Sequence, residues 1–375
     1  VSMRLFSTAL CSTVAVALLA GCSGSTSQMS SGGSSTSTVP VTPLSRHHHD
    51  RPVWASPANY IDNGSIPQAL PFYRHVIASI KDAGSQPTKG MYVNQFYGAG
   101  TMAYPINNKS NAPPFCTVAT GSGADVNGIA VDGSGNLITP VAANYSGQHA
   151  VDIWSGPGMC GKQVGTFLDP DGQPSGAFSF DAVNGTILIS NIFNNSGGAG
   201  SVSICTLSGG CTGNLSNPAM FKVAGVVMDK SGNCWASAEQ NASNGPAVLV
   251  YFAGCTGAGQ AATGFMNTDY GSLSFDRNGN LVSVDKAGVQ LWVYKGCNPA
   301  CTLVGGPFPL QGESVFGALN KQSMTFMAGD FANGQVDVYL YTPTSLTYFY
   351  SFNNGLSVSG KIEGVAYNPA QKTRQ

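Results

Sequence analysis

Residues 128–137 read Gly-Ile-Ala-Val-Asp-Gly-Ser-Gly-Asn-Leu, which is a short apolar run, a polar turn and the start of a second apolar run. Aspartate begins the turn, glycine takes the positive φ that the turn needs, and the chain then re-enters a sheet. Apolar runs of this length bounded by turn residues are typical of strands. The stretch therefore predicts a β-hairpin.

The same pattern recurs along the chain. Related stretches begin at residues 177, 225, 271, 317 and 364, so successive copies start 46 to 49 residues apart. Each full copy continues with a third apolar strand, as in Ala150-Val-Asp-Ile-Trp and Val336-Asp-Val-Tyr, and with a weaker fourth strand. Four strands in a unit of this length are typical of one β-propeller blade.

The last copy is incomplete, and the beginning of the repeat region supplies its missing strands. Stretches beginning at Met91, Thr101 and Phe115 match a second, a third and a fourth strand. We therefore predict an all-β, six-bladed propeller over residues 85–370, with four strands in each blade. Pairing of the C-terminal strand around Val365 with the strand around Tyr92 would close the ring and remove exposed sheet edges.

The segments outside the repeat have a different composition. Residues 1–21 contain Arg4 and then an apolar run, which is typical of a signal peptide. Residues 22–51 are rich in Ser, Gly and Thr and predict a flexible tether. We expect residues 52–84 to be an extension packed on the propeller and residues 371–375 to be a short tail.

The end of the apolar run, Leu18-Leu-Ala-Gly-Cys22, resembles the bacterial lipobox. The resemblance implies cleavage before Cys22, lipidation of its thiol and partnership with a membrane through this anchor. Ser23 follows the cysteine in place of the aspartate that often marks inner-membrane retention. We therefore expect a lipoprotein of the bacterial cell envelope, in the outer membrane and facing the periplasm or the exterior.

Charge argues against a nucleic-acid partner. Charged residues make up 9% of the chain and the formal net charge is −1, whereas about 25% is usual in soluble proteins. Binding to phosphate backbones needs clustered Lys and Arg side chains.

The cysteines of an exported domain predict disulfides. Cys205 and Cys211 bracket one turn between a third and a fourth strand, and Cys297 and Cys301 bracket another. Cys234 and Cys255 lie on adjacent antiparallel strands of one blade. Cys116 and Cys160 occupy similar places in neighbouring blades, and the sequence leaves open whether they pair.

The repeat Gly-Ile-Ala-Val-Asp-x-x-Gly-Asn-Leu, followed by a Val-x-Val-Tyr strand, resembles NHL-type repeats of bacterial extracytoplasmic propellers. The resemblance covers about residues 85–370 and implies six blades. Residues just before each innermost strand line one mouth of the central channel. The resulting candidates for ligand binding are Glu363, Asn127, Tyr270, Phe316 and Asp269.

The residues predicted at this mouth of the channel are compatible with two alternative functions. The neighbouring loops are rich in amides, hydroxyls and aromatic rings, which favours a non-catalytic binding or scaffolding module without a cofactor, whose ligand is an envelope protein, a peptide or a glycan. Alternatively, Glu363-Gly364 and Asn127-Gly128 resemble gluconolactonase-like propellers. That resemblance implies a lactonase-like hydrolase with one divalent metal, such as calcium, on Glu363 and Asn127. The places of the remaining ligands hold Gly176, Ala224 and Phe316.

Overall fold

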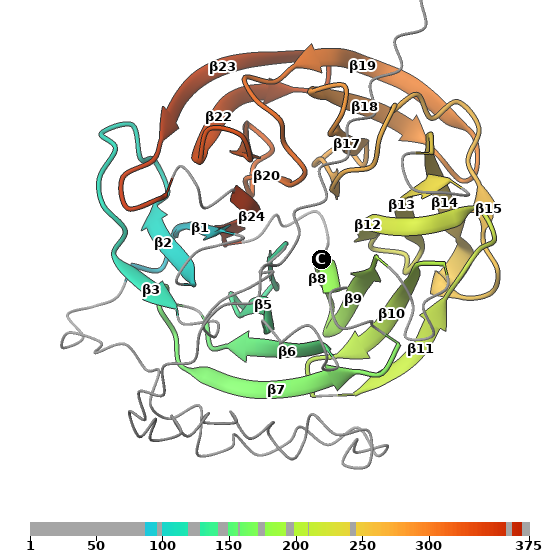
Figure 1. Ribbon diagram of the computed structural model, residues 1–375, viewed down its shortest axis with the longest axis horizontal. Coiled ribbons are helices and arrows are strands. Elements are labelled where there is room, and N and C mark those ends of the chain that lie inside the picture. Colours follow the sequence, from blue (N-terminus) through green and yellow to red (C-terminus); the bar gives the residue numbers. More distant parts are fainter. Residues whose placement is uncertain are drawn as a thin grey trace, which may run out of the picture. The chain divides into compact units, whose positions relative to one another are not determined.

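The computed structural model describes residues 87–95, 100–118, 128–141, 149–156, 158–171, 177–192, 199–208, 210–240, 245–357 and 362–369. These residues belong to one compact unit, residues 49–375. They form six four-stranded antiparallel sheets that are the blades of a ring (Figure 1). Within these ranges no helix has the length and apolar character needed to cross a membrane. The fold is the predicted six-bladed propeller.

Each blade runs from an innermost strand beside the ring axis to an outermost strand at the rim (Figure 1). The innermost strands are β4 (Ala130–Val131), β8 (Ala177–Val183), β12 (Met220–Met228), β16 (Leu273–Phe275), β20 (Gly317–Leu319) and β24 (Ile362–Asn368). The second strands are β1 (Gly90–Gln95), β5 (Leu137–Val141), β9 (Thr186–Asn191), β13 (Cys234–Gln240), β17 (Leu281–Asp285) and β21 (Thr325–Asp330).

The outer half of each blade completes the sheet. The third strands are β2 (Thr101–Pro105), β6 (His149–Trp154), β10 (Ser201–Thr206), β14 (Ala247–Phe252), β18 (Gln290–Gly296) and β22 (Gln335–Thr342). The outermost strands are β3 (Cys116–Val118), β7 (Gln163–Asp169), β11 (Cys211–Leu215), β15 (Gln260–Ala261), β19 (Cys301–Pro309) and β23 (Ser345–Phe352). A 3-10 turn, η4 (Ala253–Cys255), follows β14.

One blade contains strands from both ends of the repeat region. Its order is β24-β1-β2-β3, and β24 pairs antiparallel with β1. Tyr92 lies opposite Ala366, and Val93 lies opposite Val365. The incomplete sixth copy therefore obtains its remaining strands from the N-terminal side, as predicted, with the two paired strands one residue out of the alignment of Val365 with Tyr92.

The aspartates of the repeat hold the turns between innermost and second strands. Asp132 Oδ1 accepts hydrogen bonds from the backbone N–H groups of Ser134 (2.9 Å) and Asn136 (2.7 Å). The side-chain amide of Asn136 donates to Asp132 Oδ2 at 2.7 Å. Asp229 and Asp276 make the same three kinds of contact. In these three turns the Asp-x-x-Gly-Asn motif therefore stabilises a hairpin, because N–H groups of the same turn donate to both oxygens of the aspartate carboxylate.

Aromatic side chains pack adjacent blades together. Trp235 of β13 makes an edge-on contact with Phe275 of β16, with 5.1 Å between the ring centroids. Trp154 and Trp292 are also buried, as expected for packing between sheets. This packing fixes neighbouring blades against one another.

Four disulfides join the described cysteines. Three are the predicted pairs, Cys205–Cys211, Cys297–Cys301 and Cys234–Cys255. The fourth joins Cys116 to Cys160, the pairing that the sequence left open. It connects the outermost strand β3 of one blade to the β6–β7 turn of the next blade.

The expectations for the ends of the chain concern residues outside the described ranges. These are the signal peptide, Cys22, the tether, the extension over residues 52–84 and the tail over residues 371–375.

Candidate functional site

The loop that precedes β16 forms part of the channel mouth, and Asp285 holds it in place. The Asp285 carboxylate accepts hydrogen bonds from the Thr268 backbone N–H (2.8 Å), the Thr268 hydroxyl (2.9 Å) and the Asp269 backbone N–H (3.1 Å). The Tyr270 N–H in turn donates to Asp269 Oδ1 at 2.8 Å. Asp285, the last residue of β17, is fully buried. It holds the backbone of Asp269 directly, and Asp269 in turn holds the backbone of Tyr270.

The ring of Tyr270 lies between charged groups. Lys286 Nζ is 5.4 Å from the ring centroid, within the range of a cation–π contact. The same ammonium group is 3.6 Å from Glu313 Oε1. Burial raises the pKa of the Tyr270 hydroxyl, and the carboxylates of Asp269, Glu239, Glu363 and Glu313 raise it further. Tyr270 therefore remains a neutral phenol at physiological pH.

A second ion pair lies beside this ring. Lys222 Nζ is 3.2 Å from Glu239 Oε2, and the Glu239 side chain is 3% exposed. The pKa of Asp269 is raised, mainly by burial and also by the charges of Glu239 and Asp285. The hydrogen bond from the Tyr270 N–H and the charge of Lys286 act in the opposite direction. Charged groups of both signs thus lie near Tyr270, and the carboxylates outnumber the lysines.

The predicted candidates do not all share one environment. Asp269 and Tyr270 are partly exposed at the mouth. Glu363 is 6% exposed, on the innermost strand β24. Phe316 is 4% exposed and packs in an apolar cluster with Ala224 and Ile362, against which Tyr270 also packs. Asn127 lies outside the described residues.

The position of Phe316 differs from that of a ligand-stacking residue. It is buried in this apolar cluster, so no open face of its ring is available for a ligand to cover. The sequence analysis selected this residue because it precedes an innermost strand. That criterion places a residue near the channel but does not separate side chains that are buried in the core from those that border the mouth.

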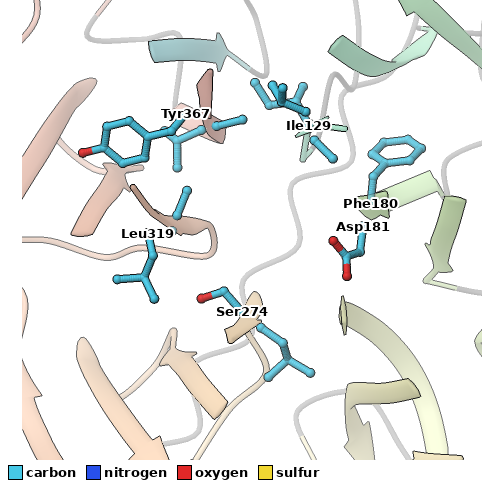
Figure 2. Close-up of a pocket in the computed structure, with 13 residues that line it drawn as sticks. Ile129, Phe180, Asp181, Ser274, Leu319 and Tyr367 are labelled. Atoms are coloured by element: carbon cyan, nitrogen blue, oxygen red, sulfur yellow. The ribbon is translucent and has the colours of Figure 1, made fainter. Parts of the chain in front are cut away.

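A cavity of about 90 Å³ lies in the channel. Its walls come from β4, β8, β16, β20 and β24, and the labelled residues of Figure 2 surround it. Most of the lining is apolar, with Asp181 and Ser274 as polar members. The Asp181 carboxylate accepts hydrogen bonds from the backbone N–H groups of Ala182 (3.0 Å) and Met228 (2.8 Å). It therefore supports the strands around the cavity.

Four residues of the mouth were missed by the sequence analysis as candidates: Lys222, Glu239, Asp285 and Lys286. Asp285 is the last residue of a second strand, and Lys286 directly follows it. A systematic list of the residue at the end of each second strand would have included Asp285. The pairing of Lys222 with Glu239 depends on the register of β12 against β13, where Lys222 lies opposite Glu239.

The fold and this mouth define the chain as a six-bladed β-propeller. In comparisons with protein-family models and with curated proteins, nothing matches the chain. Solved structures share its architecture. A periplasmic gluconolactonase of Pseudomonas aeruginosa aligns with a TM-score of 0.53 at 11% identity, covering 74% of this chain and 98% of the other.

Two further structures match at similar levels. A chain of a nidogen/laminin complex aligns with a TM-score of 0.52 at 14% identity, covering 76% of this chain and 99% of the other. A protein of unknown function from Bacteroides caccae aligns with a TM-score of 0.51 at 11% identity, covering 74% and 98%. At these identities the likeness shows the propeller fold, which hosts many unrelated functions.

Proposed function

We propose that this protein is a lipid-anchored extracytoplasmic propeller whose channel mouth binds an envelope protein, a peptide or a glycan without converting it. The observation that carries the proposal is the partly exposed Tyr270 ring, with Lys286 above it and the carboxylates of Asp269 and Glu313 nearby. An aromatic face bordered by charged groups offers stacking together with directional hydrogen bonds.

The cavity that the described innermost strands line favours binding on a surface over enclosure of a substrate. Phe316 and Ala224 are buried in an apolar cluster, and this cavity has a volume of about 90 Å³. Sites that enclose a small substrate usually measure about 300–1,000 Å³. A ligand would therefore contact the mouth from outside, where the rigid blades hold the loops.

The binding proposal is tested by replacing Tyr270 with alanine. Tyr348→Ala is the matched control, because Tyr348 is 44% exposed on the rim strand β23, a different part of the ring. Glycan arrays and pull-downs from envelope extracts are carried out with the wild type and both variants. We expect a ligand that the wild type and Tyr348→Ala retain and Tyr270→Ala loses. Equal capture by all three proteins would contradict the proposal.

The anchor is supported by the Leu18–Cys22 motif and is tested separately. We expect the wild type to incorporate labelled palmitate and to fractionate with outer membranes, whereas Cys22→Ser does neither. A wild type that carries no lipid would contradict this part of the proposal and leave the ligand site unaffected.

A second candidate function is lactonase-like hydrolysis, which the buried Glu363 on the innermost strand β24 favours. The described residues do not fit the metal that this activity would use. Within them, no three His, Cys, Asp or Glu side chains converge as a metal site requires. We therefore derive no step through a metal. Stoichiometric metal that disappears in Glu363→Ala, together with lactone hydrolysis, would make this candidate the leading one.

A further inference from the structure

The six outermost strands differ in how well their free edges are protected. Proteins usually protect a free sheet edge by shortness, proline, charge or bulges, because its unpaired N–H and C=O groups would otherwise pair with another chain. β3, β15 and β11 have three, two and five residues. Five of the seven residues of β7 are buried. β19 contains Pro307 and Pro309 and pairs with β18 across two register shifts. These five edges are therefore short, covered or interrupted.

The sixth edge, β23, lacks most of these protections. Its eight residues include no proline, no glycine and no charged residue. One register shift, which leaves Phe349 without a partner in β22, is the irregularity that it retains. Among the described residues β22 is the strand that pairs with β23, which forms the outer rim of its blade (Figure 1). Since alternate residues of a strand direct their N–H and C=O groups to opposite sides, the outer side of β23 is open to a further strand.

Both ends of β23 are held in place. The Pro343 carbonyl, in the turn before β23, lies against Gly305 of β19, where an added Cβ atom would meet it. After β23, the N–H groups of Asn353 and Asn354 donate to Asn111 Oδ1, each at 2.9 Å. A strand that is already fixed at both ends loses little conformational entropy when it pairs.

The blade that ends in β23 carries a large share of the exposed apolar side chains. Nine large hydrophobic side chains are exposed in the described part of the chain, and four of them belong to this blade or its turns: Met324, Leu340, Tyr348 and Phe349. Leu340 of β22 lies opposite Thr347 of β23. A concentration of exposed apolar side chains is typical of a surface that binds another protein.

The charges of this surface favour an uncharged partner. Residues 338–360 contain no charged residue, and Asp337, just before them, is buried. The Lys109 ammonium group lies over the Phe349 ring, 3.9 Å from its centroid. A charged partner strand would lose hydration and find no opposite charge on β23. A strand of the same sequence brings no charge, and antiparallel pairing of two identical strands is self-complementary.

We propose that β23 pairs antiparallel with β23 of a second copy of this chain. The four strands of each blade then join into one sheet of eight strands across a twofold axis. Because one strand from each copy makes a small interface, monomer and dimer should interconvert with protein concentration. The pairing lies on the rim of the ring, so it is independent of any ligand at the channel mouth.

The test is the mass of the full chain in a density-matched detergent, measured by sedimentation equilibrium. We expect twice the mass of one chain as the protein concentration rises to about 200 μM. Hydrogen exchange then locates the contact. The outward N–H groups of residues 345–352 should exchange about tenfold more slowly once about 90% of the chains are dimeric, because only the monomer exposes them.

Three variants identify the strand. Tyr348→Lys and Thr347→Lys place a positive charge on exposed positions of β23, so both should raise the Kd of the dimer by about tenfold or more. Val164→Lys is the matched control, because Val164 is an exposed apolar residue of another outermost strand, β7. It should leave the Kd unchanged. Circular dichroism checks the fold of each variant, and if Tyr348→Lys does not fold, Thr347→Lys decides the question.

Two results would overturn the proposal. One is a wild type that stays monomeric at every concentration, which would mean that solvent or a different chain covers β23. The other is a dimer that both β23 variants retain, or that forms without slower exchange in residues 345–352, which would place the contact between the copies on another surface.

Discussion

Asp181 of the innermost strand β8 accepts a 2.8 Å hydrogen bond from the backbone N–H of Met228 in β12, 47 residues further along the chain. That separation is one repeat, so the contact joins the same part of two successive blades. The turn aspartates Asp132 and Asp229 fold their carboxylates back into their own turns. The turn after β8 uses Asn184-Gly185, both with positive φ, and the Asp181 carboxylate reaches the next blade instead.

Removing this contact should destabilise the propeller. Asp181→Ala leaves the buried Met228 N–H without its acceptor, which costs about 1–3 kcal/mol of unfolding free energy. Asp181→Asn keeps a carbonyl oxygen at the same place and should cost less. Urea unfolding followed by tryptophan fluorescence measures both values. An Asp181→Ala protein as stable as the wild type would show that the contact between blades contributes nothing.

The ring itself could be predicted from the sequence because each blade repeats the same local signals. Hydrophobic alternation and turn residues are properties of neighbouring positions, and copies such as those beginning at Gly128 and Gly271 reinforce one another. The truncated copy at Gly364 even indicated the partner of the last strand. The register itself was not predicted: Val93, and not the Tyr92 named from the sequence, lies opposite Val365.

The site was less predictable because its contacts join residues that share no local pattern. Lys286 meets both Tyr270 and Glu313, and nothing in the sequence gives the distance between those loops. Phe316 precedes an innermost strand, as the sequence criterion required, but it is buried in an apolar cluster. Cys116 and Cys160 could be paired only once the spacing between a rim strand and the turn of the next blade was known.

Buried carboxylates should make the folded state less stable as pH rises. Burial raises the pKa of Asp152 to about 7, although Thr166 and Gln163 donate hydrogen bonds that lower it. In the unfolded state the carboxyl has its ordinary pKa of 3.8, so the folded state holds the proton more tightly. This contribution is fully present below about pH 4 and is lost as pH rises through about 7.

Replacing Asp152 with asparagine should remove part of this pH dependence. The variant keeps an oxygen that accepts from Thr166 and Gln163 but carries no charge. At pH 8 it should be more stable than the wild type by up to roughly 4 kcal/mol, and at pH 4 the difference should be small. Unfolding free energies measured at fixed salt from pH 4 to 8 give both curves. Parallel curves for the two proteins would contradict the assignment.

The disulfides should differ in how much they stabilise the fold, because their sequence separations differ. Cys116–Cys160 closes a loop of 44 residues between two blades, whereas Cys297–Cys301 closes one of 4 residues within a hairpin. Loop-closure entropy predicts losses of about 4 and about 2 kcal/mol when each pair is changed to alanine. Denaturant unfolding of the two double variants tests this order. A larger loss for the Cys297–Cys301 pair would mean that packing around the sulfurs outweighs chain entropy.

Replacing Gly225 with alanine tests whether the fold depends on the close contact between neighbouring innermost strands. A Cβ atom added at Gly225 would lie 2.2 Å from the carbonyl oxygen of Gly271, a backbone atom of the next blade. Because backbone cannot move aside as a flexible side chain does, Gly225→Ala should separate β12 from β16 and cost about 2 kcal/mol or more. Gly213→Ala is the matched control, since its added Cβ meets only the Ile204 side chain, at 3.5 Å. Thermal unfolding of the two variants should therefore give a clear fall in Tm for Gly225→Ala and almost none for Gly213→Ala. Equal Tm values would mean that the blades shift to accept the extra methyl group, and that the spacing of the innermost strands is set by the packing of the outer strands.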